Sequence, residues 1–118
     1  MRRKPGALLP LELSILEAGI ELRRRGLVEF HGFLLASQIR EQAGAKLLTA
    51  YGTLYKALER MEQAGLLESR WEDPLLAAQE GRPRRRLYQV TAAGAAALAA
   101  AQAARDGSTP SAKGWAPA

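Results

Sequence analysis

The densest positive charge in the sequence lies in EGRPRRRLYQV, residues 80–90, where four arginines fall within five positions around one proline. The residues that follow alternate like a strand, so Tyr88 and Val90 are expected on one face. Gly81 and Pro83 suit a turn before this strand, because proline cannot donate to a strand ladder. Arginines at a hairpin tip can follow a phosphate backbone or enter a minor groove. The candidate DNA-binding residues of this segment are Arg82, Arg84, Arg85 and Arg86.

A predicted helix over about 49–64 carries a second set of candidate DNA contacts. Leu54, Leu58 and Met61 recur at helical spacing and form its expected buried stripe. The opposite face offers a hydroxyl group and cations, which can contact base edges or phosphates, and Arg60 is expected at the phosphate backbone. An ordinary solvated face is the alternative, which this helix alone does not exclude. The candidate DNA-binding residues here are Tyr51, Thr53, Tyr55, Lys56 and Arg60.

The residue types that catalysis and metal binding require are scarce. The sequence has one histidine, His31, no cysteine, and one aspartate before the tail, Asp73. No cluster has the spacing of metal ligands, no serine lies in a nucleophile elbow, and no glycine-rich loop precedes a helix. His31 stands at a predicted helix start, where it is expected to cap or pack. We therefore expect neither an enzyme nor a cofactor or metal site.

The charge balance indicates a polyanionic partner. Among 118 residues, 17 are Lys or Arg and 12 are Asp or Glu, which gives a net charge of +5. Nucleic acid and an anionic membrane surface both fit this charge, but no predicted helix pairs a basic face with large apolar residues. The basic start is followed by Pro10, Glu12 and Glu17, which the apolar core of a signal peptide would not contain. No apolar stretch is long enough to span a bilayer, so a cytoplasmic protein is expected.

Four helices are expected to position these residues. The first begins near Pro10 and ends at Gly26, and the second covers about 32–43. The third is the candidate DNA-binding helix, for which Thr49 is a suitable N-cap. Thr91 is expected to cap a last, alanine-rich helix that follows the second strand.

Two strands are predicted, LLESRWED and RLYQV, with 74–84 between them as a loop. The connector 44–48 joins the second and third helices, and a hairpin follows them, which is the order of a helix-turn-helix with a wing. The expected fold is mainly α, with three helices, a two-stranded wing and a C-terminal helix. The expected segments are a basic flexible arm over 1–7, a DNA-binding domain over 8–91, a C-terminal dimerisation helix over 92–105 and a disordered tail over 106–118.

The first predicted helix carries two apolar stripes and therefore needs two partners. Leu13, Leu16 and Ile20 share one face, and a second set of apolar residues lies roughly opposite. One stripe is assigned to the core and the other to a second subunit; burial of both within one monomer is the alternative. The alanines of the last helix would let helices approach closely. The candidate dimer-interface residues are Leu11, Ile15, Ala18, Leu22 and Leu98.

Three segments in this order and spacing resemble the PadR family of bacterial transcriptional regulators: HGFLLASQIREQAG, YGTLYKALERMEQAGLLESRWED and GRPRRRLYQVTAAGAAAL. The resemblance covers about residues 8–104. It implies a winged-helix homodimer that represses transcription from a palindromic operator, with the first and last helices forming the dimer interface. Some members bind aromatic or drug-like effectors there, which makes a small aromatic effector a candidate partner. This sequence departs from the family at Lys56, where proline is frequent, and in its alanine-rich last helix, since Trp115 lies beyond it.

Two function classes remain after this comparison. The leading hypothesis is a DNA-binding transcriptional regulator, with double-stranded DNA as its partner. The alternative is a winged-helix module that binds protein without sequence-specific DNA binding; the wing arginines and Lys56 favour the first. Trp71 and Tyr88 are interpreted as packing at the base of the wing.

Overall fold

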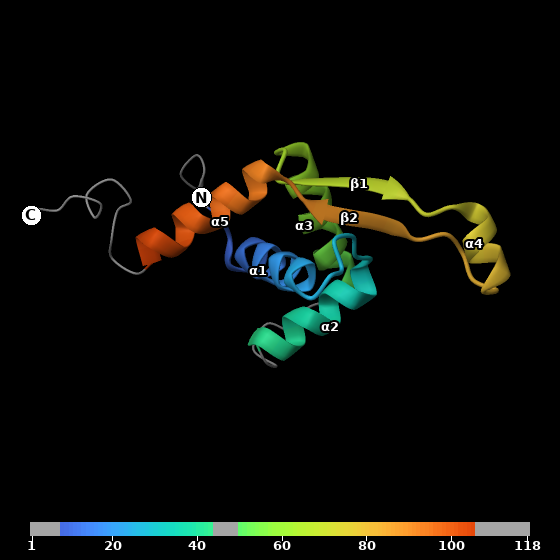
Figure 1. Ribbon diagram of the computed structural model, residues 1–118. Helices are drawn as coiled ribbons and strands as arrows, with labels where there is room; N and C mark the ends of the chain where they lie inside the picture. Colours follow the sequence, from blue (N-terminus) through green and yellow to red (C-terminus); the bar gives the residue numbers. More distant parts are fainter. Residues whose placement is uncertain (1–7, 44–49, 106–118) are drawn as a thin grey trace, which may run out of the picture.

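A computed structural model describes residues 8–43 and 50–105 of the chain. Four of its five helices gather into one body, from which a two-stranded hairpin projects with the short helix α4 at its far end (Figure 1). The chain is thus mainly helical, with the winged helix-turn-helix order that the sequence predicts. The elements are α1 (Pro10–Arg24), α2 (Gly32–Ala43), α3 (Tyr51–Gln63), β1 (Leu67–Trp71), α4 (Pro74–Gln79), β2 (Arg86–Val90) and α5 (Ala92–Arg105).

Three predicted segments lie outside the described residues: the basic arm over 1–7, the connector over 44–48 and the tail over 106–118. Thr49, the predicted cap of α3, lies outside them as well. The helix begins at Tyr51 after Ala50, which makes no side-chain cap.

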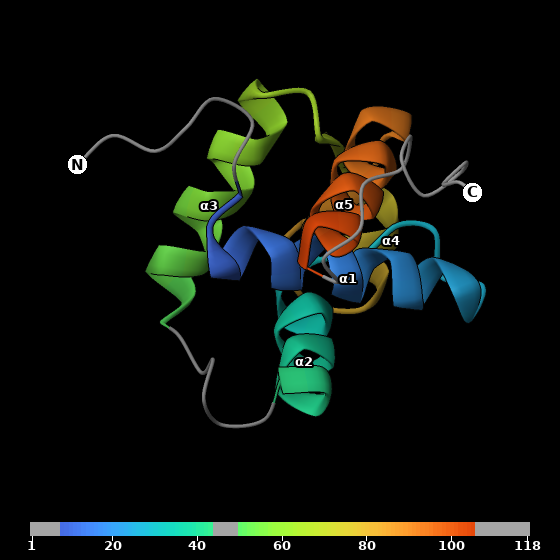
Figure 2. The same ribbon diagram turned by 90° about the vertical axis from the view of Figure 1, so that its left-hand side faces the viewer.

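Helix α1 is the centre of the apolar core. It packs against α2, α3, β2 and α5, and Figure 2 shows α2 on one side of it and α5 on the other. Both of its apolar stripes are therefore covered within one chain. The buried core side chains come from every helix of the body and from both strands: Ile15, Leu16, Ala18, Leu22, Phe30, Leu35, Ile39, Leu54, Ala57, Leu58, Met61, Leu67, Tyr88, Val90 and Leu98.

This packing corrects the predicted dimer interface. Ile15 and Ala18 are 0% exposed in the single chain, and Leu22 and Leu98 are 2% and 6% exposed. Leu11 is partly buried and packs against the same core. These side chains have almost no area left to bury against a second subunit. Helical periodicity showed that both stripes are apolar, but the element that covers the second stripe is α5 of the same chain.

The wing is a two-stranded antiparallel sheet with Leu67 opposite Val90 and Trp71 opposite Arg86. The loop between α1 and α2 fastens its base. Phe30 pairs with Tyr88 through two backbone hydrogen bonds of 2.9 and 2.8 Å. Next to it, the Glu29 carboxylate accepts two hydrogen bonds of 2.7 Å from the Arg70 guanidinium, which lowers the pKa of Glu29. This attachment was not predicted from the sequence.

The segment between the strands is a short helix, α4, and not the predicted loop. Asp73 caps it, since its Oδ1 accepts the N–H of Leu75 at 2.9 Å, and Pro74 occupies the first turn, where its missing N–H is harmless. Gly81 follows with a φ of 68°. The tip of the wing therefore presents the exposed side chains of Leu75 and Leu76, and the arginines lie nearer the body.

The predicted ends of the other helices are confirmed. Gly26 and Gly65 follow α1 and α3 with φ values of 93° and 82°, a backbone region that glycine enters without penalty. Thr91 caps α5: its Oγ1 accepts the N–H of Gly94 at 3.0 Å and donates to the carbonyl of Gly65 at 2.7 Å.

Candidate nucleic-acid interface

Helix α3 exposes one face along its first two turns. Its buried stripe of Leu54, Leu58 and Met61 is as predicted, with Ala57 added. The remaining positions of these turns face solvent because no element of the described chain covers them. The exposed candidates are Tyr51, Thr53, Tyr55 and Lys56.

Arg60 differs from these four candidates. Its Nε donates to Oε2 of Glu12 at 2.8 Å, and Glu12 is only 2% exposed. The other carboxylate oxygen of Glu12 accepts the N–H of Leu9 at 2.9 Å, at the start of α1. Arg60 therefore anchors α3 to α1. We correct its expected role at the phosphate backbone to this internal one.

Tyr55 fixes the angle between α3 and α2. Its phenol lies directly against Gly32, and a Cβ at Gly32 would overlap the ring and its hydroxyl. The ring is nevertheless 43% exposed. Tyr55 thus packs the two helices of the helix-turn-helix together and still offers an aromatic surface to a ligand.

The run of arginines divides between the two faces of the wing. Successive side chains on extended backbone point to opposite faces, so Arg84 and Arg86 share a face. The guanidinium carbon of each lies 5.1 Å from the centre of the Trp71 ring. Arg85 points to the other face, where it meets His31.

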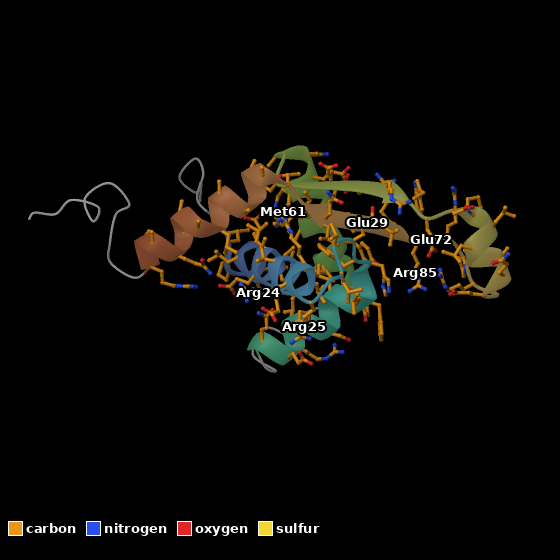
Figure 3. All side chains as sticks on the ribbon, viewed as in Figure 1. Arg24, Arg25, Glu29, Met61, Glu72 and Arg85 are labelled. Carbon is orange, nitrogen blue, oxygen red and sulfur yellow. The ribbon has the colours of Figure 1, made fainter. Side chains whose placement is uncertain are left out.

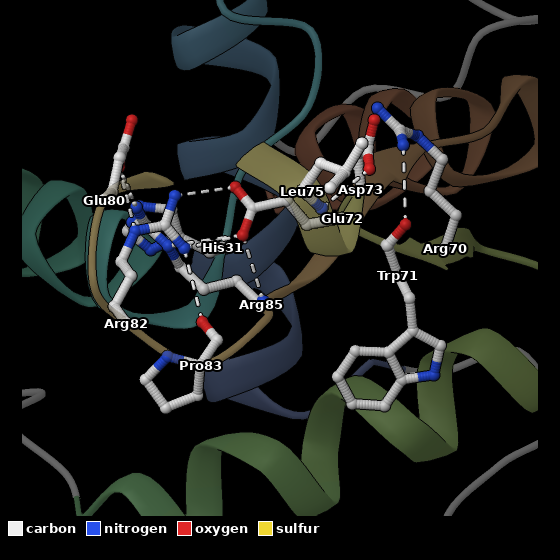
Figure 4. Close-up of polar contacts among 10 residues, drawn as sticks. All are labelled: His31, Arg70, Trp71, Glu72, Asp73, Leu75, Glu80, Arg82, Pro83 and Arg85. Atoms are coloured by element: carbon white, nitrogen blue, oxygen red, sulfur yellow. Dashed lines mark hydrogen bonds and ion pairs between the residues drawn. The ribbon is translucent and has the colours of Figure 1, made fainter. Parts of the chain in front are cut away.

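Glu72 binds Arg82 and Arg85, the two arginines that do not lie over Trp71. Arg82 donates from Nη1 and Nη2 to the two carboxylate oxygens at 2.6 and 2.8 Å, and the backbone N–H of Arg85 donates at 3.2 Å (Figure 4). The Arg82 hydrogen bonds are the main reason that the pKa of Glu72 falls to about 2. Glu80 accepts a further bond of 3.0 Å from Arg82. The charges of Arg82 and Arg85 are therefore largely balanced inside the wing, between the strands and α4 (Figure 3).

His31 joins this cluster to α2. Its Nδ1 accepts the N–H of Leu34 at 3.3 Å, the capping role expected for it, and its Nε2 lies 2.6 Å from Nη1 of Arg85. Burial first, and then the nearby Arg85 and Arg82, lower the pKa of His31. The ring is therefore neutral near pH 7 and can stand beside a cation. Sequence reasoning did not foresee this contact with the wing.

Trp71 is the residue that sequence reasoning missed. It is 51% exposed, and its ring points towards α3, away from Glu72 (Figure 4). The interpretation as packing is correct for Tyr88, which is 7% exposed and stacks on Phe30. A signal was present in the sequence: Tyr88 faces the core, so strand alternation places Arg84 and Arg86 on the face that Tyr88 shares.

Two open hollows flank Trp71. The larger, of about 590 Å³, lies between α3 and the wing. The smaller, of about 320 Å³, lies between the start of α2 and the wing and is lined by Phe33 and Arg84 among others. Tyr55, Trp71 and Arg86 border both hollows. The exposed face of α3 and the arginines above Trp71 therefore form one continuous surface.

Two other kinds of site are not found in the parts of the chain that the structure describes. No group of three or more His, Asp or Glu side chains there could hold a metal ion. None of the helices over 8–43 and 50–105 has the length and apolar character needed to cross a membrane.

The chain matches the family model of the transcriptional regulator PadR-like family over residues 22–100. Its fold is similar to that of a transcriptional regulator from Clostridium thermocellum, at 22% identity, 81% coverage of this chain and 78% of that one, and a TM-score of 0.59. A PadR family transcriptional regulator from Eggerthella lenta DSM 2243 gives 23%, 81%, 78% and 0.58. A PadR-like transcriptional regulator from Bacillus cereus strain ATCC 14579 gives 22%, 81%, 81% and 0.59. No curated protein matches the chain.

Proposed function

The chain belongs to the PadR-like family of transcriptional regulators, and from this premise we propose that it is a cytoplasmic repressor that binds a palindromic operator as a homodimer. Members of this family are DNA-binding regulators and not enzymes. One observation supports the surface we assign to DNA: Tyr55 of α3 lines the same hollow as Arg84 and Arg86 of the wing. Repression requires only that this surface occupy promoter DNA.

In the proposed complex, the first two turns of α3 enter the major groove, as the second helix of a helix-turn-helix does. Thr53 and Lys56 face base edges or the nearest phosphates, with Tyr51 and Tyr55 at the borders. Arg84 and Arg86 meet the phosphate backbone beside the groove. Arg82 and Arg85 contribute indirectly, because their bonds to Glu72 and His31 hold the wing in place.

The dimer in this proposal uses the outer side of α5. Its exposed alanines let a second helix approach closely, whereas the predicted interface residues are buried in the monomer. A two-fold dimer would present two α3 helices to successive major grooves, about one helical turn apart. An aromatic effector is left out of the proposal, because Leu98, the one large apolar residue of α5, faces the core.

The test compares two double variants that remove the same charge. An operator is first selected from random duplex DNA, and affinity is then measured by fluorescence anisotropy at several salt concentrations. Arg84→Ala with Arg86→Ala should weaken binding and reduce the slope of log K against log salt by roughly 1.8, at about 0.9 per lost contact. Arg24→Ala with Arg105→Ala should change neither quantity, because these exposed side chains lie on α1 and α5.

Two results would contradict the proposal. The first is the absence of any enriched sequence after selection. The second is an equal loss of slope in the two double variants, which would mean that net charge and not the wing attracts DNA. Either result would favour the protein-binding module.

A further inference from the structure

We propose that Trp71 is a positioning residue that holds Arg84 and Arg86 as a paired clamp for one phosphate group of the DNA backbone. This inference rests on the proposed function and specifies how the wing meets its ligand. The argument depends on the register of the hairpin, on the distribution of charge between its two faces and on the exposure of the indole ring.

The register places all three side chains together. Trp71 is directly opposite Arg86, and Arg84 lies two residues before Arg86, on the same face. Directly opposed side chains in an antiparallel pair are in contact, and diagonal neighbours are within reach of long side chains. Each guanidinium carbon accordingly lies 5.1 Å from the ring centre. A cation within about 6 Å of the face of an indole is attracted by its quadrupole, so one ring restrains two arginines.

The charge on this face is not balanced, in contrast to the charge on the other. Arg82 forms ion pairs with Glu72 and Glu80 at 2.6 and 3.0 Å. Arg86 approaches Glu62 only to 3.8 Å, and Arg84 forms no ion pair with any carboxylate of the described residues. Two like charges held over one ring therefore favour an anion that can lie between them. A phosphodiester group has the charge and the paired oxygens that guanidinium groups bind.

The position of Trp71 indicates what the ring contributes. It is 51% exposed and separates the two hollows, so its removal opens no hole in the core. Long arginine side chains lose rotamer freedom when they bind a ligand. A ring that already restrains them reduces this loss. Trp71 should therefore affect the affinity for DNA much more than it affects stability.

The experiment measures binding of random-sequence duplex DNA by anisotropy, with thermal unfolding of each variant as a check on folding. Trp71→Ala should weaken binding about fivefold with little change in melting temperature and in the salt slope, because both arginines remain. Trp71→Leu, which keeps an apolar side chain without a ring face, should behave in the same way. Trp71→Phe should restore most of the affinity. Leu75→Ala, at the exposed tip of the same wing, serves as the control and should bind like the wild type.

The decisive measurement is a double-mutant cycle. In the Arg84→Ala, Arg86→Ala background, Trp71→Ala should have no further effect on DNA affinity, because the residues it positions are gone. An equal loss in both backgrounds, or wild-type binding by Trp71→Ala and Trp71→Leu, would overturn the role of Trp71. Failure of the proposed function gives a different result, since loss of the two arginines would then leave DNA binding unchanged.

Discussion

At the scale of single residues, the role of each wing arginine depends on which face of the hairpin it occupies. The alternation that places Tyr88 in the core extends back along the chain and separates Arg85 from its two neighbours. This much follows from the sequence. The partners do not, because the residues opposite the arginines depend on the register of the hairpin. That register spans α4, and its length was not predicted.

Glu72 makes the stability of the wing dependent on pH. Its pKa is about 2 in the folded chain against an ordinary 4.5, chiefly because Arg82 donates to it. Its contribution is therefore fully present above about pH 4.5 and is lost as the pH falls towards 2. Glu72→Gln should lower the melting temperature at pH 7, and the difference from the wild type should shrink between pH 4.5 and 2. Thermal unfolding across this range checks the prediction.

The control for this prediction is Glu68→Gln, which removes an exposed carboxylate from the same hairpin. It accounts for the general effect of losing one negative charge from a basic protein. If the difference between Glu72→Gln and the wild type stays constant as the pH falls from 5 to 2, the bond between Arg82 and Glu72 contributes nothing to folding.

At the scale of elements, the sequence predicts the helices of the body and misses the contacts between distant segments. Apolar periodicity, Gly26, Gly65 and Thr91 mark the helix ends correctly. The pairing of Phe30 with Tyr88 has no local signal, because it joins residues 58 positions apart by backbone groups alone. The helix α4 was missed because a proline before it and a glycine after it are also typical of loops.

The start of α5 is pressed against the base of the wing at Gly94. A Cβ there would overlap the carbonyl oxygen of Leu66 and crowd a methyl group of Val90. Helix propensity alone would make Gly94→Ala stabilising by about 1 kcal/mol, but overpacking costs roughly 1–3 kcal/mol. We expect a net loss of about 1–2 kcal/mol in the free energy of unfolding, measured by urea denaturation, since backbone atoms cannot move aside cheaply.

Gly52 provides the matched comparison. It lies in α3, is exposed, and a Cβ there would meet nothing within 4 Å. Gly52→Ala should therefore stabilise the chain by about 0.5–1 kcal/mol. Stabilisation by both substitutions would mean that α5 does not dock closely on the wing base.

At the scale of the whole molecule, two apolar stripes on α1 show that the helix is central and leave open what covers it. Within one chain, α5 does so, and Ile15 has no exposed surface. Ile15→Glu would place a carboxylate in this core without a partner, a change that destabilises by several kcal/mol. We expect this variant to be unfolded at neutral pH, as measured by circular dichroism, and not to be a folded monomer. A folded Ile15→Glu variant would show that the stripe is open to solvent.

The proposed dimer must therefore form on the outer side of α5, where Ala96 and Ala100 are exposed one turn apart. Ala96→Glu with Ala100→Glu places two charges on that side and none in the core, so the chain should remain folded. Sedimentation at tens of micromolar should then show a monomer, where the wild type is a dimer. Since two linked half-sites bind far more tightly than one, the affinity of the variant for the full operator should fall to that for a half-site. A wild-type monomer at these concentrations would refute the dimer and leave the DNA-binding surface of the single chain as the functional unit.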